Sequence, residues 1–358
     1  HGTIHTLSSC HQTHPLILMK KSILWGLLVL FCALIVAAAV VAHSLFGGST
    51  GNAEEVVVTV PHQATYEQMK DSLRAKHVLV RERGFDRAAR LMRFKTIRPG
   101  HYKIQPNTSN VSLVRLLRRG QHYPVKFAFN NVRTVDQFVD KVGDKFFFAP
   151  TELRTLLADS GFVGKYGFDK QTLPALFIPN SYEIFYDITA EDFVAKMYDF
   201  YNQFWTDKRR AQADAIGLTP VEVATLASIV EEENHRPAEK AIIAGLYMNR
   251  IHKGMLLQAD PTVKFALGDF ARKRILNADL QVDSPYNTYK YKGLPPGPIR
   301  MPEGSTMDSV LHYTHHDYLY MCAKEDLSGY HNFTSSAAQH AANAARYRAA
   351  LNRQNIKR

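Results

Sequence analysis

Cysteine is scarce in this chain of 358 residues, which contains Cys10, Cys32 and Cys322 and no other. Cys10 lies near the start and Cys32 lies within an apolar run, so the long remainder holds one thiol and cannot form an internal disulfide. No Cys or His spacing typical of a zinc site occurs, and the adjacent His315 and His316 would point apart on a helix. The sequence therefore excludes a disulfide scaffold and predicts neither a metal nor another cofactor.

Acidic residues are also in short supply. The chain has 33 Asp and Glu against 44 Lys and Arg, which gives a formal net charge of +11 at pH 7. Such a balance favours an anionic partner: nucleic acid, an acidic membrane surface or an acidic polymer. Charge alone does not choose among these three. The length suits about two globular domains with additional segments.

Charge is absent from one long stretch, residues 23–42, which is long enough to cross a bilayer as a helix. Lys20 and Lys21 precede it, and no charge follows before Glu54, so the N-terminus is expected in the cytoplasm and the bulk outside. A cleaved signal peptide is the alternative, although the run exceeds the usual apolar core of such peptides. We expect residues 1–18 to be an unstructured extension and residues 19–43 to be the anchor. An external location excludes nucleic acid as a partner.

The remainder predicts an α+β protein in two parts. After a Gly- and Ser-rich linker, residues 54–120 predict a strand, two helices, a strand and a further helix. This βααβ order is similar to the LysM-like modules that often bind glycan. Residues 121–355 predict a larger, mainly helical α+β domain. Within it we expect one long helix over 191–216 and an ordered, aromatic-rich loop over 173–186.

The larger domain contains a helix with a clear start. Thr219 and Glu222 have the spacing of a capping box, and Pro220 takes the first helical position, where its missing N–H costs nothing. Apolar residues then recur at helical spacing as far as Val230. The pattern predicts an amphipathic helix with one apolar stripe.

Three adjacent glutamates, Glu231, Glu232 and Glu233, end this helix. At about 100° per residue, Glu231 and Glu233 fall on opposite edges of the apolar stripe, and Glu232 is expected to face water. A carboxyl group against apolar surface has a raised pKa, so it can be protonated at neutral pH and act as a general acid. A solvated acidic run is the alternative interpretation.

Two later segments combine polar and aromatic groups with Pro. The first holds Gln258 and Asp260, although an Asp before Pro261 is also typical of a turn. The second, residues 284–299, has too much Pro and Gly for regular structure, so packing must order it. It contains four consecutive groups suited to sugar recognition: Tyr286, Asn287, Thr288 and Tyr289. A plain surface loop is the alternative.

In their order and spacing, residues 227–233, 249–250, 257–263, 286–289 and 293–299 closely resemble the YceG-like endolytic murein transglycosylases of bacteria. The resemblance covers roughly residues 56–347 and includes an anchor and a LysM-like module. It implies cleavage, within peptidoglycan strands, of the β-1,4 bond between N-acetylmuramic acid and N-acetylglucosamine, leaving a 1,6-anhydro end. The residue here that we match to the catalytic one is Glu231.

The resemblance also suggests supporting roles. We expect Glu233, Gln258, Asp260 and residues 286–289 to orient Glu231 or hold the glycan, and Asn249 and Arg250 to brace two helices. The chain would sit in the bacterial inner membrane with its catalytic part periplasmic, and peptidoglycan synthases are candidate partners. Two rivals stay open: a hydrolase that uses a second carboxylate, and a glycan-binding scaffold without catalysis.

Overall fold

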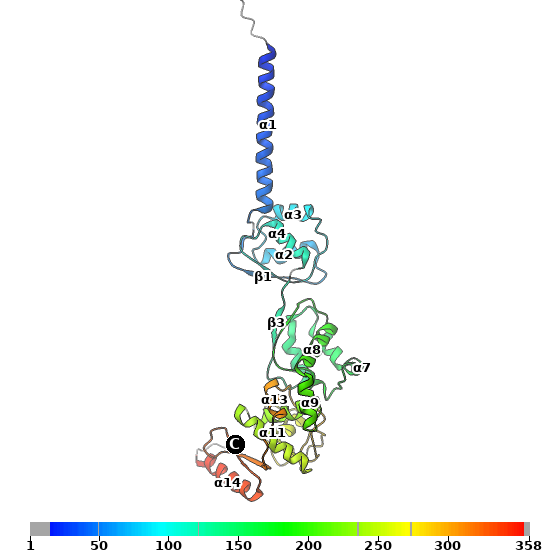
Figure 1. Cartoon of the computed structure of the whole chain (residues 1–358), viewed down its shortest axis with the longest axis vertical. Coiled ribbons are helices and arrows are strands. Elements are labelled where there is room, and N and C mark those ends of the chain that lie inside the picture. Colours follow the sequence, from blue (N-terminus) through cyan, green and yellow to red (C-terminus); the bar gives the residue numbers. More distant parts are fainter. Residues whose placement is uncertain (1–14, 49, 121, 235, 273, 354–358) are drawn as a thin grey trace, which may run out of the picture. The chain divides into compact units, whose positions relative to one another are not determined.

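A computed structural model describes residues 15–48, 50–120, 122–234, 236–272 and 274–353 (Figure 1). The chain forms two compact units, His1–Tyr123 and Pro124–Arg358. Helices and short strands mix in both, which confirms the α+β class. The boundary between the units lies a few residues after the last helix of the first one.

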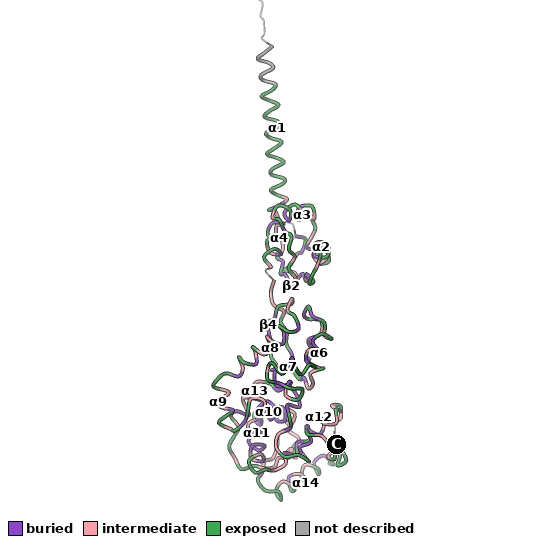
Figure 2. Tube along the Cα trace, turned by 90° about the vertical axis from the view of Figure 1, so that its right-hand side faces the viewer, coloured by how far each residue is buried: buried purple, intermediate pink, exposed green. Residues whose placement is uncertain are grey.

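The first unit opens with one long helix, α1 (Pro15–Phe46). It begins inside the range expected to be unstructured, because Pro is favourable at the start of a helix and apolar residues then continue it; residues 1–14 lie outside the described residues. Its side chains from Ile23 to Ala42 are exposed, and α1 appears green in Figure 2. Within the described residues, Ile23–Phe46 is long and apolar enough to cross a membrane, a property that a signal sequence would share.

The expected βααβ order is confirmed in the first unit. The elements are β1 (Val56–Val60), α2 (Tyr66–Ala75), α3 (Glu82–Leu91), β2 (Gly100–Ile104) and α4 (Asn110–Arg119). The two strands pair antiparallel, with Val58 opposite Tyr102, and both side chains are buried in the unit's core. Gly120, at a φ of 65°, ends α4 in the left-handed region that glycine favours. The likeness to LysM stays a prediction.

Within the described residues, the second unit carries two two-stranded antiparallel sheets among its helices. Its elements are β3 (Val125–Ala128), α5 (Val135–Val142), η1 (Gly143–Lys145), α6 (Pro150–Ala158), α7 (Ser160–Gly164), η2 (Leu173–Leu176), β4 (Ser181–Ile184), α8 (Ala190–Phe204), α9 (Asp207–Ala215), α10 (Pro220–Glu233), α11 (Pro237–His252), α12 (Asp260–Leu267), η3 (Asp279–Gln281), α13 (Gly304–Leu311), β5 (Tyr320–Ala323), β6 (His331–Thr334) and α14 (Ala337–Arg353).

Two local predictions for this unit were wrong. The single helix over 191–216 is two helices, α8 and α9, because the Thr206 side chain accepts from the backbone N–H of Arg209 and starts a new helix. The loop over 173–186 contains β4, which pairs with β3 so that Phe127 lies opposite Tyr182. That pairing joins residues far apart in sequence, so no local pattern reveals it.

Helix α10 is buried on every side rather than along one stripe. Every residue from Val223 to Glu231 is buried, and α9, α11, α12 and α13 all pack against the helix (Figure 2). Its start is as predicted: Thr219 and Glu222 form the capping box. The surface expected to face water is therefore covered, which changes the surroundings of the glutamates that end the helix.

Candidate active site

Glu231 lies in a buried ion pair. Its Oε1 is 3.1 Å from Nη2 of Arg300, and its Oε2 accepts from the backbone N–H of Glu303 at 2.9 Å and from the Thr306 hydroxyl at 2.8 Å. Both oxygens thus have donors, and Glu231 does not line the cavity that Glu233 lines. The structure does not bring Glu231 together with the other expected site residues.

Glu232 does not face water, so that prediction was wrong. Its side chain is 11% exposed and lies 2.8 Å from Nη1 of Arg300 and 2.9 Å from Nη2 of Arg133. The cause is the full burial of α10, which places the segment around Arg300 over the side expected to be solvated. We call Glu231, Glu232, Arg300, Arg133 and Thr306 the Arg300 cluster.

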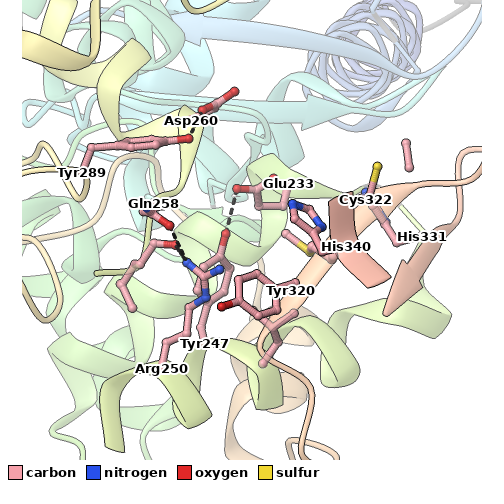
Figure 3. A pocket seen from close by; sticks show the side chains of 14 residues that line it. Glu233, Tyr247, Arg250, Gln258, Asp260, Tyr289, Tyr320, Cys322, His331 and His340 are labelled. Atoms are coloured by element: carbon pink, nitrogen blue, oxygen red, sulfur yellow. Dashed lines mark hydrogen bonds between the residues drawn. The ribbon is translucent and has the colours of Figure 1, made fainter. Parts of the chain in front are cut away.

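Glu233 lines a cavity of about 410 Å³, which we call the Glu233 cavity (Figure 3). Its Oε1 accepts from the hydroxyl of Tyr247, on α11, at 2.8 Å. Burial raises the pKa of Glu233 to about 7, and the nearby charges of Asp260 and Glu232 act in the same direction. The Tyr247 hydrogen bond and Arg250 lower this pKa without cancelling the effect of burial. Glu233 is therefore poised to hold or release a proton near neutral pH.

Arg250 fixes one wall of the Glu233 cavity. Its Nη1 donates to the carbonyls of Leu256 and Leu257 at 3.0 and 2.9 Å, and its Nε donates to the carbonyl of Leu319 at 2.7 Å. The guanidinium also stands 5.3 Å from the ring centre of Tyr320. Arg250 thus braces α11 against loops rather than against a second helix.

Asn249, the neighbour of Arg250, is tied to a loop as well. Its Nδ2 donates to the carbonyls of His316 and Tyr318 at 2.6 and 3.0 Å. The expected bracing role therefore holds for the pair, but its target is the segment that precedes β5.

Gln258 and Asp260 both line the Glu233 cavity. Gln258 has a φ of 53°, and its Oε1 accepts from Nη1 of Arg250 at 3.3 Å. Asp260 accepts from the hydroxyl of Tyr289 at 2.6 Å and begins α12. Asp260 thus starts a helix rather than the turn that the alternative interpretation predicted, and it contributes a carboxylate to the cavity.

The four residues 286–289 do not act together. Tyr289 lines the Glu233 cavity, whereas Asn287 and Thr288 are buried. Asn287 donates to the carbonyls of residues 280 and 282, and the Thr288 hydroxyl accepts from the N–H of Ala259 at 3.0 Å. Tyr286 lines a different cavity and packs on Phe265. Asn287 and Thr288 therefore shape the loop, and Tyr289 is the member that faces Glu233.

Several cavity residues carried no role in the sequence. Tyr247 reaches Glu233 from another helix, so no local spacing marks it. His331 and His340 both line the cavity, although they come from β6 and α14. His331 Nδ1 lies 2.9 Å from Oε2 of Glu239, and the ring of His340 stacks on Tyr320 with its pKa lowered by burial. Within the described residues, no group of three His, Cys, Asp or Glu could hold a metal.

Known proteins resemble this chain over much of its length. An endolytic murein transglycosylase of Bacillus subtilis (strain 168) is 37% identical over 154 residues, which cover 43% of this chain and 42% of that protein. An endolytic murein transglycosylase of Streptococcus pneumoniae serotype 2 is 26% identical over 329 residues, 79% of this chain and 57% of that protein. The chain thus spans about half the length of these curated relatives.

A solved structure supports the same relationship. A yceG-like protein from Listeria monocytogenes matches with a TM-score of 0.52 and 26% identity, covering 81% of this chain and 99% of that one. The model of the YceG-like family matches residues 58–346, which include the Arg300 cluster and the residues around the Glu233 cavity. This chain belongs to the YceG-like family.

Proposed function

We propose that this chain is an endolytic lytic transglycosylase of peptidoglycan and that Glu233 is its catalytic acid and base. The observation that carries the proposal is the carboxyl of Glu233, which has a pKa of about 7 and lines a cavity of about 410 Å³. Relatives named endolytic murein transglycosylases support the substrate and the reaction class. A proton donor of this pKa matches the need of a general acid near neutral pH.

This proposal moves the catalytic role from Glu231 to Glu233. Glu231 is buried, and Arg300, Thr306 and the N–H of Glu303 already supply donors to its two oxygens. Glu233 has one protein donor, Tyr247, and an open cavity on its other side. A group that must first give and then take a proton needs access to the substrate, and Glu233 has it.

The proposed reaction needs one carboxyl group. Protonated Glu233 gives its proton to the glycosidic oxygen as the bond to the anomeric carbon of N-acetylmuramic acid breaks. The carboxylate then takes the proton of that sugar's C6 hydroxyl, whose oxygen bonds to the anomeric carbon and forms the 1,6-anhydro ring. Glu233 ends protonated and no water is consumed. Because the nucleophile belongs to the sugar itself, proximity supplies much of the rate.

The cavity walls suit an uncharged sugar. Tyr247, Tyr289 and Tyr320 line the cavity and offer hydroxyl groups and ring faces. Arg250 is held by backbone carbonyls, so it stabilises the loop that carries Gln258 and Asp260. We assign Gln258, Asp260 and Tyr289 to holding the glycan against Glu233.

One observation favours a second candidate function, a hydrolase of the same bond. Asp260 lines the same cavity as Glu233 and helps to raise its pKa, so it is the candidate for a second carboxylate. A hydrolase would leave a free reducing end, because water replaces the C6 hydroxyl as nucleophile. The hydrogen bond from Tyr289 occupies one oxygen of Asp260 and favours a positioning role instead.

We also propose that α1 anchors the chain in the inner membrane, with the second unit on the periplasmic side. Lys20 and Lys21 precede the apolar stretch, and the positive-inside rule then retains them in the cytoplasm. The βααβ module of the first unit would bind glycan as LysM-like modules do. The substrate would be nascent strands, whose elongation the cut ends, and peptidoglycan synthases are candidate partners.

The test is mass spectrometry of peptidoglycan digested by the full-length chain and by its Glu233→Gln and Glu231→Gln forms. We expect anhydro products from the wild type and from folded Glu231→Gln, and none from Glu233→Gln. Free reducing ends that require Glu233 would identify a hydrolase. Products that persist in Glu233→Gln and vanish in folded Glu231→Gln would return the acid to Glu231.

A further inference from the structure

A second cavity, of about 680 Å³, adjoins the Glu233 cavity. The two cavities share Glu233 and Asp260 among their lining residues, so a substrate held at Glu233 can extend from one into the other. The second cavity is rich in cations, and we call it the basic cavity. Its basic lining residues are Lys264, Arg272, Arg274 and Arg348.

The cations of the basic cavity come from separate parts of the chain. Lys264 lies on α12, one helical turn after Asp260, so the two side chains share a face of that helix. Arg348 lies on α14, and Tyr347 and Leu351 of the same helix also line the basic cavity. The tertiary fold thus gathers charges that no single segment supplies.

Within the described residues, protein carboxylates leave two of these charges unpaired, those of Lys264 and Arg348. Arg272 forms ion pairs with Asp269 and Asp279, so its charge is already neutralised within the protein. Neither Lys264 nor Arg348 has a carboxylate within ion-pair distance in the part of the chain that the structure describes. Of the acidic residues lining the cavity, Glu232 is already paired within the Arg300 cluster. The basic cavity therefore keeps cations available for an anionic ligand.

We infer that the basic cavity binds the carboxylates of the peptide that hangs from the glycan strand beside the bond to be cut. This inference rests on the proposed function. Muramic acid carries its peptide through a lactyl group, so a muramic acid at Glu233 brings an acidic peptide next to Lys264 and Arg348. Guanidinium and ammonium groups bind carboxylates through charge-assisted hydrogen bonds, and in a cavity water screens these less than on an open surface. The enzyme would then select strands that still bear their peptides.

The same cations could bind phosphate, for instance on a lipid carrier or a phosphate-bearing wall polymer. The position favours the peptide, because the basic cavity borders the cutting site itself through Glu233 and Asp260. Phosphate carried elsewhere on the strand would have no fixed distance to that site. A competition with inorganic phosphate separates the two sources.

Binding to the full-length Glu233→Gln chain, kept in non-ionic detergent, tests the inference without cleavage. Fluorescent uncrosslinked strands are compared with the same strands after an amidase has removed their peptides, and Kd is read by anisotropy. We expect peptide-bearing strands to bind at least about tenfold more tightly, as one charge-assisted contact allows. Adding Lys264→Gln and Arg348→Gln should remove that advantage and leave the Kd for bare strands unchanged.

Lys208→Gln is the matched control, because Lys208 is an exposed basic residue of α9 that does not line the basic cavity. Lys208→Gln should change the Kd for peptide-bearing strands and the Kd for bare strands by no more than about twofold, which is the effect expected of one surface charge. Equal affinity of the two strands for the unaltered cavity would overturn the inference, and so would equal weakening of both by the double variant. Displacement of peptide-bearing strands by inorganic phosphate, but not by acetate at equal ionic strength, would assign the cavity to phosphate instead.

Failure of this inference can be told apart from failure of the proposed function. If the wild type cleaves both kinds of strand and both bind equally, the reaction stands and the peptide subsite falls. If peptide-bearing strands bind more tightly through Lys264 and Arg348 but the wild type cuts neither, the subsite stands and the chain is a glycan-binding protein.

Discussion

The Arg300 cluster and the Glu233 cavity are built from neighbouring residues of α10 and have opposite electrostatic character. In the cluster, Glu231 and Glu232 share Arg300, and Thr306 and Arg133 supply further donors. At the cavity, Glu233 has a tyrosine hydroxyl as its partner and a pKa raised by burial. The first arrangement stabilises charge, and the second makes charge costly.

The difference indicates which carboxyl can work as an acid. A carboxylate with an arginine at 3.1 Å is stabilised in its charged form by that neighbour, and it serves the fold by joining α10 to the segment that carries Arg300. A carboxyl in an apolar and aromatic setting retains its proton to higher pH. In the proposed function, Glu231 therefore serves the fold and Glu233, two residues later on the same helix, serves the chemistry.

The sharpest way to break this comparison is Glu233→Gln. We expect the cleavage rate to fall by about 10³-fold or more, because the amide can neither give nor take the proton. Folding should be unharmed, since an amide fits the same site without a charge to bury. Rates from product mass spectrometry and a urea unfolding curve of the full-length chain measure both effects. Retention of more than a few per cent of the rate, or a large loss of stability, would contradict the assignment.

Glu231→Gln should have the converse effect. Loss of this carboxylate leaves Arg300 short of one partner in a buried place, and we expect the free energy of unfolding to fall by about 3 kcal/mol. Activity per folded molecule should stay within about threefold of wild type, as for a residue that acts through packing. Urea unfolding and rates corrected for the folded fraction check this.

Glu232→Gln supplies the graded control for the cluster. Its side chain is 11% exposed, so we expect a smaller loss of about 1 kcal/mol. If Glu231→Gln instead kept its stability and lost cleavage per folded molecule, Glu231 would be the catalytic residue and the assignment to Glu233 would be wrong.

The pH dependence of stability sharpens the comparison further. The folded pKa of Glu233, about 7, lies above its ordinary value of 4.5, so the folded state binds this proton more tightly than the unfolded state. The contribution of this proton to the free energy of unfolding is complete below pH 4.5 and is lost as pH rises to about 7. Against wild type, Glu233→Gln should therefore gain stability over this range, by on the order of 2 kcal/mol. Urea unfolding at a series of pH values measures the gain, and a constant difference would show that Glu233 is not perturbed.

Tyr247→Phe should have the smallest effect. The Tyr247 hydroxyl stabilises the charged form of Glu233, so its removal raises the pKa of Glu233 further. The alkaline limb of the plot of kcat/KM against pH should move to higher pH. At the optimal pH, kcat/KM should fall by about threefold, as expected for the loss of one hydrogen bond. A purely structural tyrosine would lower activity and leave the limb in place. The pH–rate profile distinguishes the two.

Local patterns predicted well where neighbours in sequence decide the outcome. The capping box of Thr219 and Glu222 formed as expected, because all its partners lie within one helical turn. The βααβ order of the first unit also formed as expected, because strand alternation and turn residues are local signals. The single helix over 191–216 failed because the Thr206 cap was overlooked, although the residue type was a signal for it.

The expected site residues come together only in part. Gln258, Asp260 and Tyr289 do share a cavity with Glu233, but Asn287 and Thr288 are buried with internal partners. Glu231 was chosen by matching the family motif, and a motif match cannot easily distinguish between glutamates that stand side by side in the sequence. The physical argument for Glu231 assumed an amphipathic helix with one exposed face, whereas α10 is buried all round.

The sequence by itself determined the helices and most of their ends, the apolar stretch that begins the chain, and the family to which the chain belongs. These depend on residue types and spacings within a few turns of chain. Only the tertiary structure decided which glutamate is ion-paired and which is left protonatable. Arg300 comes from a loop and Tyr247 from another helix, and a carboxyl's pKa is set by what lies within a few ångströms in space.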